Sequence, residues 1–221
     1  MGVSSKPYLF PDLRFYRRIC EAGWFGFAWD NSFDKRHKDA RRYTIADVNG
    51  KLTLTVPIVK PESISNARWE DILISSHGDW QSVHLTALES AYGRTPFFEF
   101  YIDSFRPLFS KEWNGRSLKD FVEESHKIIS SHLSTISSAC CGLSEIDKIR
   151  PKEDGNNDEW TEYWQPRAER LGFIGGLSIL DALFCIGPET NFLLKDFSCG
   201  LVRSTSGGTE EEYKEKSSCR E

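Results

Sequence analysis

The side chains in this sequence that could do chemistry gather in one aromatic-rich stretch, residues 84–109. His84 and Tyr92 are eight residues apart, so on a helix they lie on the same face. A histidine with a pKa of about 6.5 can act as a general base near neutral pH, and a neighbouring tyrosine can orient or donate. The alternative is a buried histidine that donates to a backbone carbonyl. Glu89 and Arg94 are either amine and anion contacts or ordinary charges facing water.

Asp181 is a second candidate, because it interrupts the apolar run LSILDALF at 177–184. A buried carboxylate needs a partner or an altered pKa. Asp181 is therefore either an acid in a cleft or half of a structural lock with Arg167 or Arg170. The lock is the favoured interpretation.

A cationic run precedes the central pair of predicted strands, with Lys35, Lys38, Arg41 and Arg42 close together in sequence. Guanidinium groups bind phosphate or carboxylate oxygens in pairs, so this run suits an anionic ligand. A solvated loop is the alternative, because acidic residues are interleaved with the cations: Asp30, Asp34 and Asp39.

The composition of the whole chain limits the classes of function. Its 221 residues carry a net charge of −5, which gives no general attraction for nucleic acid. No apolar run is long enough to span a membrane, no signal peptide is recognisable, and the scattered cysteines indicate free thiols in the cytoplasm. Motifs for nucleotide phosphates, serine hydrolases and zinc proteases do not occur, so the cofactor stays unassigned and no metal site is predicted.

The elements that must position these residues form a mixed α/β fold, with N-terminal strands, a β-hairpin and one helix before a largely helical C-terminal half. Asp12 predicts a helix cap, and 24–29 a buried strand. Asn49-Gly50 between alternating apolar residues predicts a hairpin with a type I′ turn. We expect one domain over 1–199 and a disordered tail over 200–221.

Helical patterns follow the hairpin. Residues 80–92 predict one helix, and Thr95-Pro96 predicts the cap and first residue of the next. Ser117 predicts the cap of an amphipathic helix that continues through Ile136. A polar break at 150–159 precedes a compact apolar unit at 163–189.

Two longer segments resemble the WbqC-like family of bacterial proteins. They are WQSVHLTALESAYGRTPFFEFYIDSFRPLF, at 80–109, and GFIGGLSILDALFCIGPE, at 172–189. Weaker likenesses are PYLFPDLRFY, at 7–16, and the entry to the hairpin, so the resemblance covers residues 7 to about 196. The matching positions are Arg42, His84, Tyr92, Pro96, Ser178, Asp181 and Gly187. The chain departs from the family pattern at Arg41 and Cys185, where the family commonly has asparagine.

The resemblance implies a cytoplasmic step in surface-polysaccharide biosynthesis of the O-antigen type, with acyl or aminoacyl transfer onto an amino sugar as the activity. A small-molecule substrate such as a nucleotide-linked sugar is then expected. Its diphosphate would lie against Arg42, Lys35 and Arg94, while His84, Tyr92 and Asp181 would be catalytic. The alternative is a non-enzymatic partner protein that docks a biosynthetic enzyme. Such a partner role is a different class of function from a transferase.

Overall fold

The computed structural model of this chain describes residues 3–22, 25–64, 66–139 and 160–195. The predicted mixed α/β fold is confirmed, with helices concentrated after the hairpin. Both the polar break at 150–159 and the tail predicted over 200–221 lie outside the described residues, as do Cys140, Cys141, Cys199 and Cys219. The single domain over 1–199 stays a prediction.

The strands are β1 Val3–Ser5, β2 Phe25–Phe27, β3 Arg42–Asp47 and β4 Gly50–Thr55. The helices are α1 Leu13–Ala22, α2 Trp80–Tyr92, α3 Phe98–Phe105, α4 Leu118–His132, α5 Ser134–Ala139, α6 Ala168–Leu171, α7 Ile179–Ile186 and α8 Thr190–Lys195. Short 3-10 turns occur at η1 Trp69–Asp71, η2 Arg106–Phe109, η3 Lys111–Trp113 and η4 Gly187–Glu189.

Helix α1 connects two short parallel strands, β1 and β2. Asp12 caps α1 as predicted, because its carboxylate accepts a hydrogen bond from the backbone N–H of Phe15 at 3.1 Å. The strand predicted over 24–29 is shorter, and its partner β1 was not predicted. Parallel strands need a crossover connection, and α1 supplies it.

The hairpin of β3 and β4 is confirmed, but its predicted turn type is wrong. Asp47 pairs with Gly50, so Val48 and Asn49 form the turn. Asn49 does not have a positive φ, whereas Gly50 has φ +111°. A turn of ordinary residues followed by a glycine with positive φ replaces the Asn-Gly type I′ turn, because the glycine alone accepts that backbone angle.

Helix α2 ends before Gly93 as predicted, but the cap predicted at Thr95 is wrong. The hydroxyl of Thr95 donates to the carbonyl of Tyr92 at 2.7 Å, and α3 begins only at Phe98. The N-cap position of α3 is held by Phe97, two residues after Thr95, so Thr95 does not cap this helix.

Helix α4 begins after Ser117 as predicted, since the Ser117 hydroxyl accepts from the backbone N–H of Lys119. The helix does not continue through Ile136: it ends at His132, and α5 begins at Ser134. Leu133 between them leaves helical geometry and is fully buried. Burial of this side chain in the core outweighs continuation of the helix.

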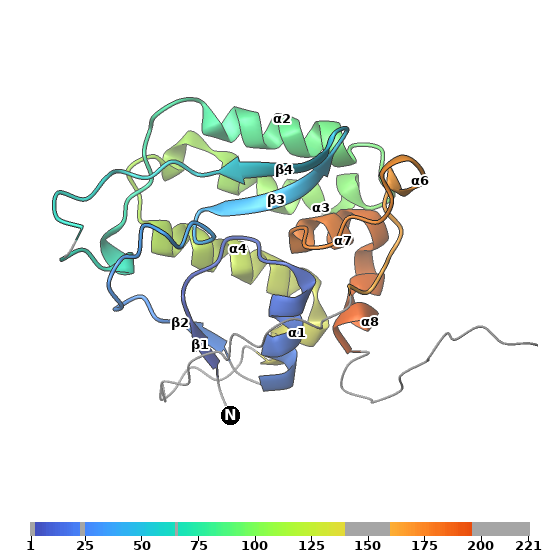
Figure 1. Cartoon of the computed structure of the whole chain (residues 1–221), viewed down its shortest axis with the longest axis horizontal. Helices are drawn as coiled ribbons and strands as arrows, with labels where there is room; N and C mark the ends of the chain where they lie inside the picture. The colour runs from blue at the N-terminus through green and yellow to red at the C-terminus, as the bar shows by residue number, and fades with distance from the viewer. Residues whose placement is uncertain (1–2, 23–24, 65, 140–159, 196–221) are drawn as a thin grey trace, which may run out of the picture.

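The hairpin lies against α2, and α7 contacts the same strand β3 (Figure 1). Figure 1 shows the small β1–β2 pair near the N-terminus, away from α2. The core between these elements is aromatic, and its largest fully buried side chains include Tyr16, Trp69, Tyr92, Phe105 and Phe184. In the described part of the chain, no helix combines the length and apolar character needed to cross a membrane.

Candidate functional site

His84 lies beneath the hairpin with both ring nitrogens engaged. Its Nδ1 is 3.1 Å from the hydroxyl of Tyr43, and its Nε2 is 3.2 Å from the carbonyl oxygen of Thr55. A carbonyl can only accept, so Nε2 carries the proton and Nδ1 accepts from the tyrosine. The residue is 2% exposed, and burial lowers the pKa of His84 to about 4. These contacts match the buried-histidine alternative, because both ring nitrogens are hydrogen-bonded within the protein.

The two partners of His84 lie at one point of the hairpin. Thr55 is the cross-strand partner of Arg42, and Tyr43 is the next residue after Arg42. The imidazole therefore bridges β3 and β4 beneath the Arg42 pair. This contact fixes the strand position from which the Arg42 side chain extends.

Asp181 and Tyr92 are brought together, because the Tyr92 hydroxyl donates to the Asp181 carboxylate at 2.6 Å. Asp181 also accepts from the Tyr163 hydroxyl at 2.5 Å and from the side-chain amide of Gln165 at 2.9 Å. Tyr92 in turn accepts from the backbone N–H of Ala46, at 3.1 Å, which ties α7 and α2 to β3. The Asp181 cluster is a complete hydrogen-bond network in the core.

Burial and hydrogen bonding have opposite effects on the pKa of Asp181. Burial raises the pKa of Asp181, while the hydrogen bonds from Tyr163, Tyr92 and Gln165 oppose that shift. Burial and the adjacent carboxylate also raise the pKa of both tyrosines. Neither Asp181 nor Tyr92 is exposed, so a substrate has no direct route to this carboxylate.

The lock interpretation for Asp181 is supported, but both predicted partners are wrong. Arg167 donates to the carbonyls of Ala91 and Ser90 at the end of α2, and Arg170 donates to the carbonyl of Val48. Arg167 thereby satisfies carbonyls at the end of a helix, where the backbone supplies no donor. Arg167 affects Asp181 without a hydrogen bond, because its positive charge lowers the pKa of the carboxyl.

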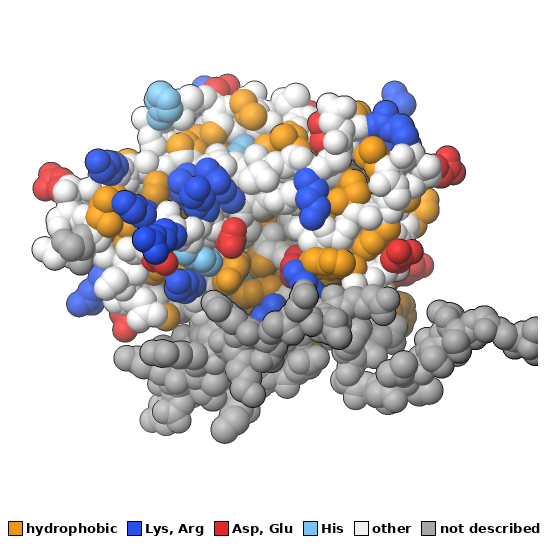
Figure 2. Space-filling model, viewed as in Figure 1, with side chains coloured by type: hydrophobic (Ala, Val, Ile, Leu, Met, Phe, Trp, Pro, Cys, Tyr) orange, Lys and Arg blue, Asp and Glu red, His pale blue; other side chains and the backbone are white. Residues whose placement is uncertain are grey.

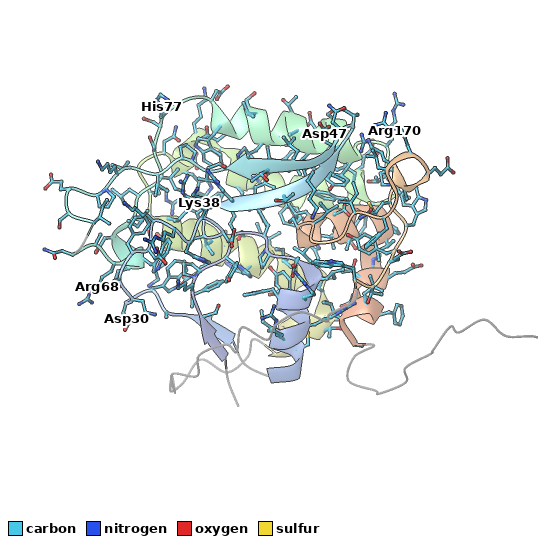
Figure 3. All side chains as sticks on the ribbon, viewed as in Figure 1. Asp30, Lys38, Asp47, Arg68, His77 and Arg170 are labelled. Carbon is cyan, nitrogen blue, oxygen red and sulfur yellow. The ribbon has the colours of Figure 1, made fainter. Side chains whose placement is uncertain are left out.

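Arg42 is half-buried at the start of β3, and its Nε is buried without a hydrogen-bond partner among the described residues. Lys35 and Lys38 are exposed in the preceding loop. Figure 3 shows Lys38 beside the beginning of β3, with Asp47 and Arg170 at the opposite end of the hairpin. Figure 2 shows several Lys and Arg side chains gathered on this face. We call the segment 35–42 the basic loop.

Arg94 does not join the basic loop. Tyr92 contacts Ala46, four residues along β3 from Arg42, so Arg94 follows at the far end of the strand. Arg94 is exposed, whereas Glu89 forms a surface ion pair with Arg106 at 3.4 Å. Both residues fit the interpretation of charges facing water, and substrate binding by Arg94 stays a prediction.

Three polar residues of these clusters were missed in the sequence: Tyr43, Tyr163 and Gln165. Tyr43 had a usable signal, because it alternates with Arg42 and so faces the core together with Ile45. Tyr163 and Gln165 had none, since the segment before α6 brings them to Asp181 from outside its helix. Among the described residues, no group of His, Cys, Asp and Glu could hold a metal ion.

The two departures from the family pattern have different surroundings. Arg41 is half-buried, and burial together with the charge of Arg42 lowers the pKa of Arg41. Cys185 is buried in α7, and burial raises the pKa of its thiol. A thiol in this position behaves as a small apolar group, whereas an asparagine would need hydrogen-bond partners.

The comparisons with known proteins place this chain in a family. The sequence profile of the WbqC-like protein family matches residues 6–155, a range that holds Arg42, His84 and Tyr92 but ends before Asp181. No curated protein and no solved structure matches the chain. Because the matched range spans more than half of the 221 residues, the chain belongs to the WbqC-like protein family.

Proposed function

We propose that this protein binds a nucleotide-linked amino sugar at the basic loop and acts in acyl or aminoacyl transfer onto that sugar. The step would belong to surface-polysaccharide biosynthesis in the cytoplasm. The observation that carries the proposal is the side chain of Arg42, with its Nε buried and unpaired among the described residues.

An unpaired buried donor is costly, by about 1–3 kcal/mol, and a ligand oxygen can remove that cost. Arg42 offers a planar set of N–H donors, which suits two oxygens of a phosphate. A diphosphate would therefore satisfy Nε and gain the attraction of a full positive charge.

The surroundings of Arg42 favour an anion. Lys35 and Lys38 form no ion pair with any described residue, whereas Asp34 is paired with Lys6 at 3.1 Å. Asp34 is therefore already used by a cation outside the basic loop. Burial lowers the pKa of Arg41, and repulsion from the neighbouring charge of Arg42 lowers it further. A bound diphosphate would relieve this repulsion.

His84 has a supporting role in this proposal. Acylation needs the sugar amine without its extra proton, and the general-base role of His84 stays a prediction. The contacts of its ring support positioning instead, because it bridges the strands beneath Arg42 and Thr55. Tyr92 and Asp181 hold the other end of β3 in the same way.

Titration calorimetry with UDP and UDP-glucosamine tests the proposal. Wild-type protein should show saturable binding of both, and Arg42→Ala should weaken both by about tenfold or more, the cost of hydrogen bonds to a charged group. Arg18→Ala, an exposed arginine on α1, is the matched control and should bind like wild type. Absence of saturable binding to wild-type protein at low salt would overturn the proposal.

The donor can be found by thermal shift once a sugar nucleotide binds. Acyl-CoAs and aminoacyl donors would be screened in its presence, because a ligand at 100 times its dissociation constant stabilises the folded state by about 2.7 kcal/mol. A donor that stabilises the complex would then be assayed for transfer to the sugar amine.

A non-enzymatic partner protein is the second candidate. It is favoured by the burial of His84 and Asp181, and by exposed aromatic side chains on α3 and α8, Phe100 at 73% and Phe192 at 66%. Exposed aromatic groups are enriched in protein interfaces. Affinity purification that recovers a stoichiometric biosynthetic enzyme would support this candidate, and saturable sugar-nucleotide binding without such a partner would count against it.

A further inference from the structure

The solvent side of the hairpin carries a row of hydroxyl groups between two cations. In the strand register, Arg42 pairs with Thr55, Thr44 with Thr53, and Ala46 with Lys51. Side chains alternate along a strand, so these residues share the face opposite Tyr43 and Ile45. On this face Lys51 and Thr53 are exposed, Arg42, Thr44 and Thr55 are half-buried, and Ala46 is buried. We call Thr44, Thr53 and Thr55 the hydroxyl row.

The hydroxyl row has the dimensions of an extended small ligand. The oxygens of Thr44 and Thr53 are 3.2 Å apart, so they form one hydrogen-bonded pair on the surface. Four residues of strand separate Arg42 from Ala46, which corresponds to about 14 Å. Figure 2 shows an uncharged band between two groups of Lys and Arg side chains over the region that the hairpin occupies in Figure 1.

The segment before α7 borders this face on the side of β3. The backbone N–H of Ser178 donates to the carbonyl of Thr44 at 2.8 Å. A Cβ on Gly176 would lie 3.5 Å from the Lys51 ammonium and 3.2 Å from the ring of Trp160. Gly175 is packed so closely on Trp160 that a Cβ there would meet its ring at 2.5 Å. Only glycine fits this approach, so the border is fixed by packing.

Trp160 is also contacted by the beginning of α1. The guanidinium carbon of Arg14 is 3.5 Å from the centroid of the Trp160 ring, and Arg14 is paired with Asp12 at 3.0 Å. Such a cation–π contact favours the stacked position of the two side chains. The border of the hydroxyl row is therefore formed by three segments of the chain, which are 175–178, Trp160, and Asp12 with Arg14.

We infer that the hydroxyl row seats the sugar of the ligand proposed above, an inference that rests on that proposed function. The pyrophosphate lies at Arg42, the ring hydroxyls contact Thr44 and Thr53, and Lys51 donates to oxygens at the far end of the sugar. Threonine hydroxyls both donate and accept, so they can pair with sugar hydroxyls of either orientation.

Two observations separate this face from an ordinary exposed hairpin, where threonine is common because it favours strands. Neither Arg42 nor Lys51 forms an ion pair with a described residue, although surface cations are usually interspersed with acids. Arg42 also keeps a buried, unpaired Nε at the end of the row. Together they leave the cations at both ends of the hydroxyl row without a paired acid among the described residues.

Calorimetry with two probes, UDP-glucosamine and UDP, tests the inference on four variants. Thr44→Val, Thr53→Val and Lys51→Ala should each weaken UDP-glucosamine by about three- to tenfold, the effect of one lost hydrogen bond, and leave UDP unchanged. Valine has the shape of threonine and favours strands, so the hairpin is kept. Lys60→Ala, an exposed lysine beyond β4, is the control for Lys51→Ala and should change neither probe.

The outcomes separate this inference from the proposed function. If wild-type protein binds neither probe, the proposed function fails and the inference fails with it. If UDP binds through Arg42 but the threonine and Lys51 variants hold UDP-glucosamine as tightly as wild type, only the inference is overturned. Equal loss of both probes in the threonine variants would also overturn it, because the row would then serve the nucleotide.

Discussion

His126 is half-buried on α4, away from the hairpin, and makes the same two kinds of hydrogen bond as His84. Its Nδ1 is 2.9 Å from the hydroxyl of Tyr16, and its Nε2 is 2.8 Å from the carbonyl oxygen of Tyr8. Burial lowers the pKa of His126 to about 4, as it does for His84. The same arrangement of a tyrosine hydroxyl, a neutral imidazole and a backbone carbonyl therefore occurs at two sites, and at each it connects segments that are distant in sequence.

The two histidines differ in what their partners present to solvent. The partners of His84 are strand residues whose neighbours are Arg42 and the hydroxyl row. His126 instead contacts the rings of Phe15 and Phe27, so its surroundings are aromatic. The bonding of a buried histidine thus says little about function, whereas the opposite face of the strand that it holds is informative.

Acid should weaken both histidine contacts, and this is the largest effect expected. In the folded state His84 and His126 stay neutral down to about pH 4, but in the unfolded chain they take up protons below about pH 6.5. Their stabilisation is complete above pH 6.5 and is lost as the pH falls from 6.5 to 4, by roughly 3 kcal/mol for each histidine. Urea unfolding at a series of pH values measures the loss.

Variants isolate the histidines in that experiment. Burial raises the pKa of Asp181, so this carboxyl shifts the free energy of unfolding in the opposite direction as the pH falls. His84→Asn and His126→Asn should each flatten the slope between pH 6.5 and 4 by up to about 1.4 kcal/mol per pH unit. A variant with the slope of wild type would show that its histidine is not held neutral.

Asp181→Ala tests a buried carboxylate that only accepts hydrogen bonds, in contrast to the two histidines. The substitution leaves donors of Tyr92, Tyr163 and Gln165 without their shared acceptor, so we expect a loss of about 3 kcal/mol in the free energy of unfolding. Asp103→Ala, at an exposed site on α3, is the control and should change stability by less than about 0.5 kcal/mol. Equal unfolding midpoints for the two variants would contradict the network.

Removing each imidazole distinguishes an effect on stability from an effect on ligand binding. His84→Ala and His126→Ala should both lower the free energy of unfolding by about 2 kcal/mol, because each removes the hydrogen bonds of an imidazole to a tyrosine hydroxyl and to a backbone carbonyl. Only His84→Ala should also weaken UDP binding, by about tenfold, since it alone releases the strands beneath Arg42. Similar weakening in both variants would place the effect in the core as a whole.

The smallest effect is expected from the tyrosine hydroxyls. Tyr43→Phe and Tyr16→Phe each remove one hydrogen bond to an imidazole while keeping the packed ring, which should cost about 1 kcal/mol. Chemical unfolding of the pair at pH 7 compares the two sites directly. A difference above about 1.5 kcal/mol would mean that the two contacts are not equivalent.

Local patterns in the sequence determined which segments form helices and strands. Asp12 and Ser117 were recognisable as caps, and alternation around Gly50 identified the hairpin, because these signals depend on neighbours in the chain. The stripe of His84 and Tyr92 on one helix face was determined in the same way. The amino-acid sequence also carried enough of the family pattern to identify the family before any fold was known.

Only the tertiary structure decided what the candidate residues touch. Gln165 meets Asp181 because a loop returns across α7, and His84 meets Thr55 because α2 packs on the hairpin. No periodicity records such contacts, since they join residues that are distant in sequence and are selected by burial of polar groups that must find partners. The sequence therefore identified polar residues of unusual type, and packing decided which of them became supports and which, like Arg42, kept an unpaired donor.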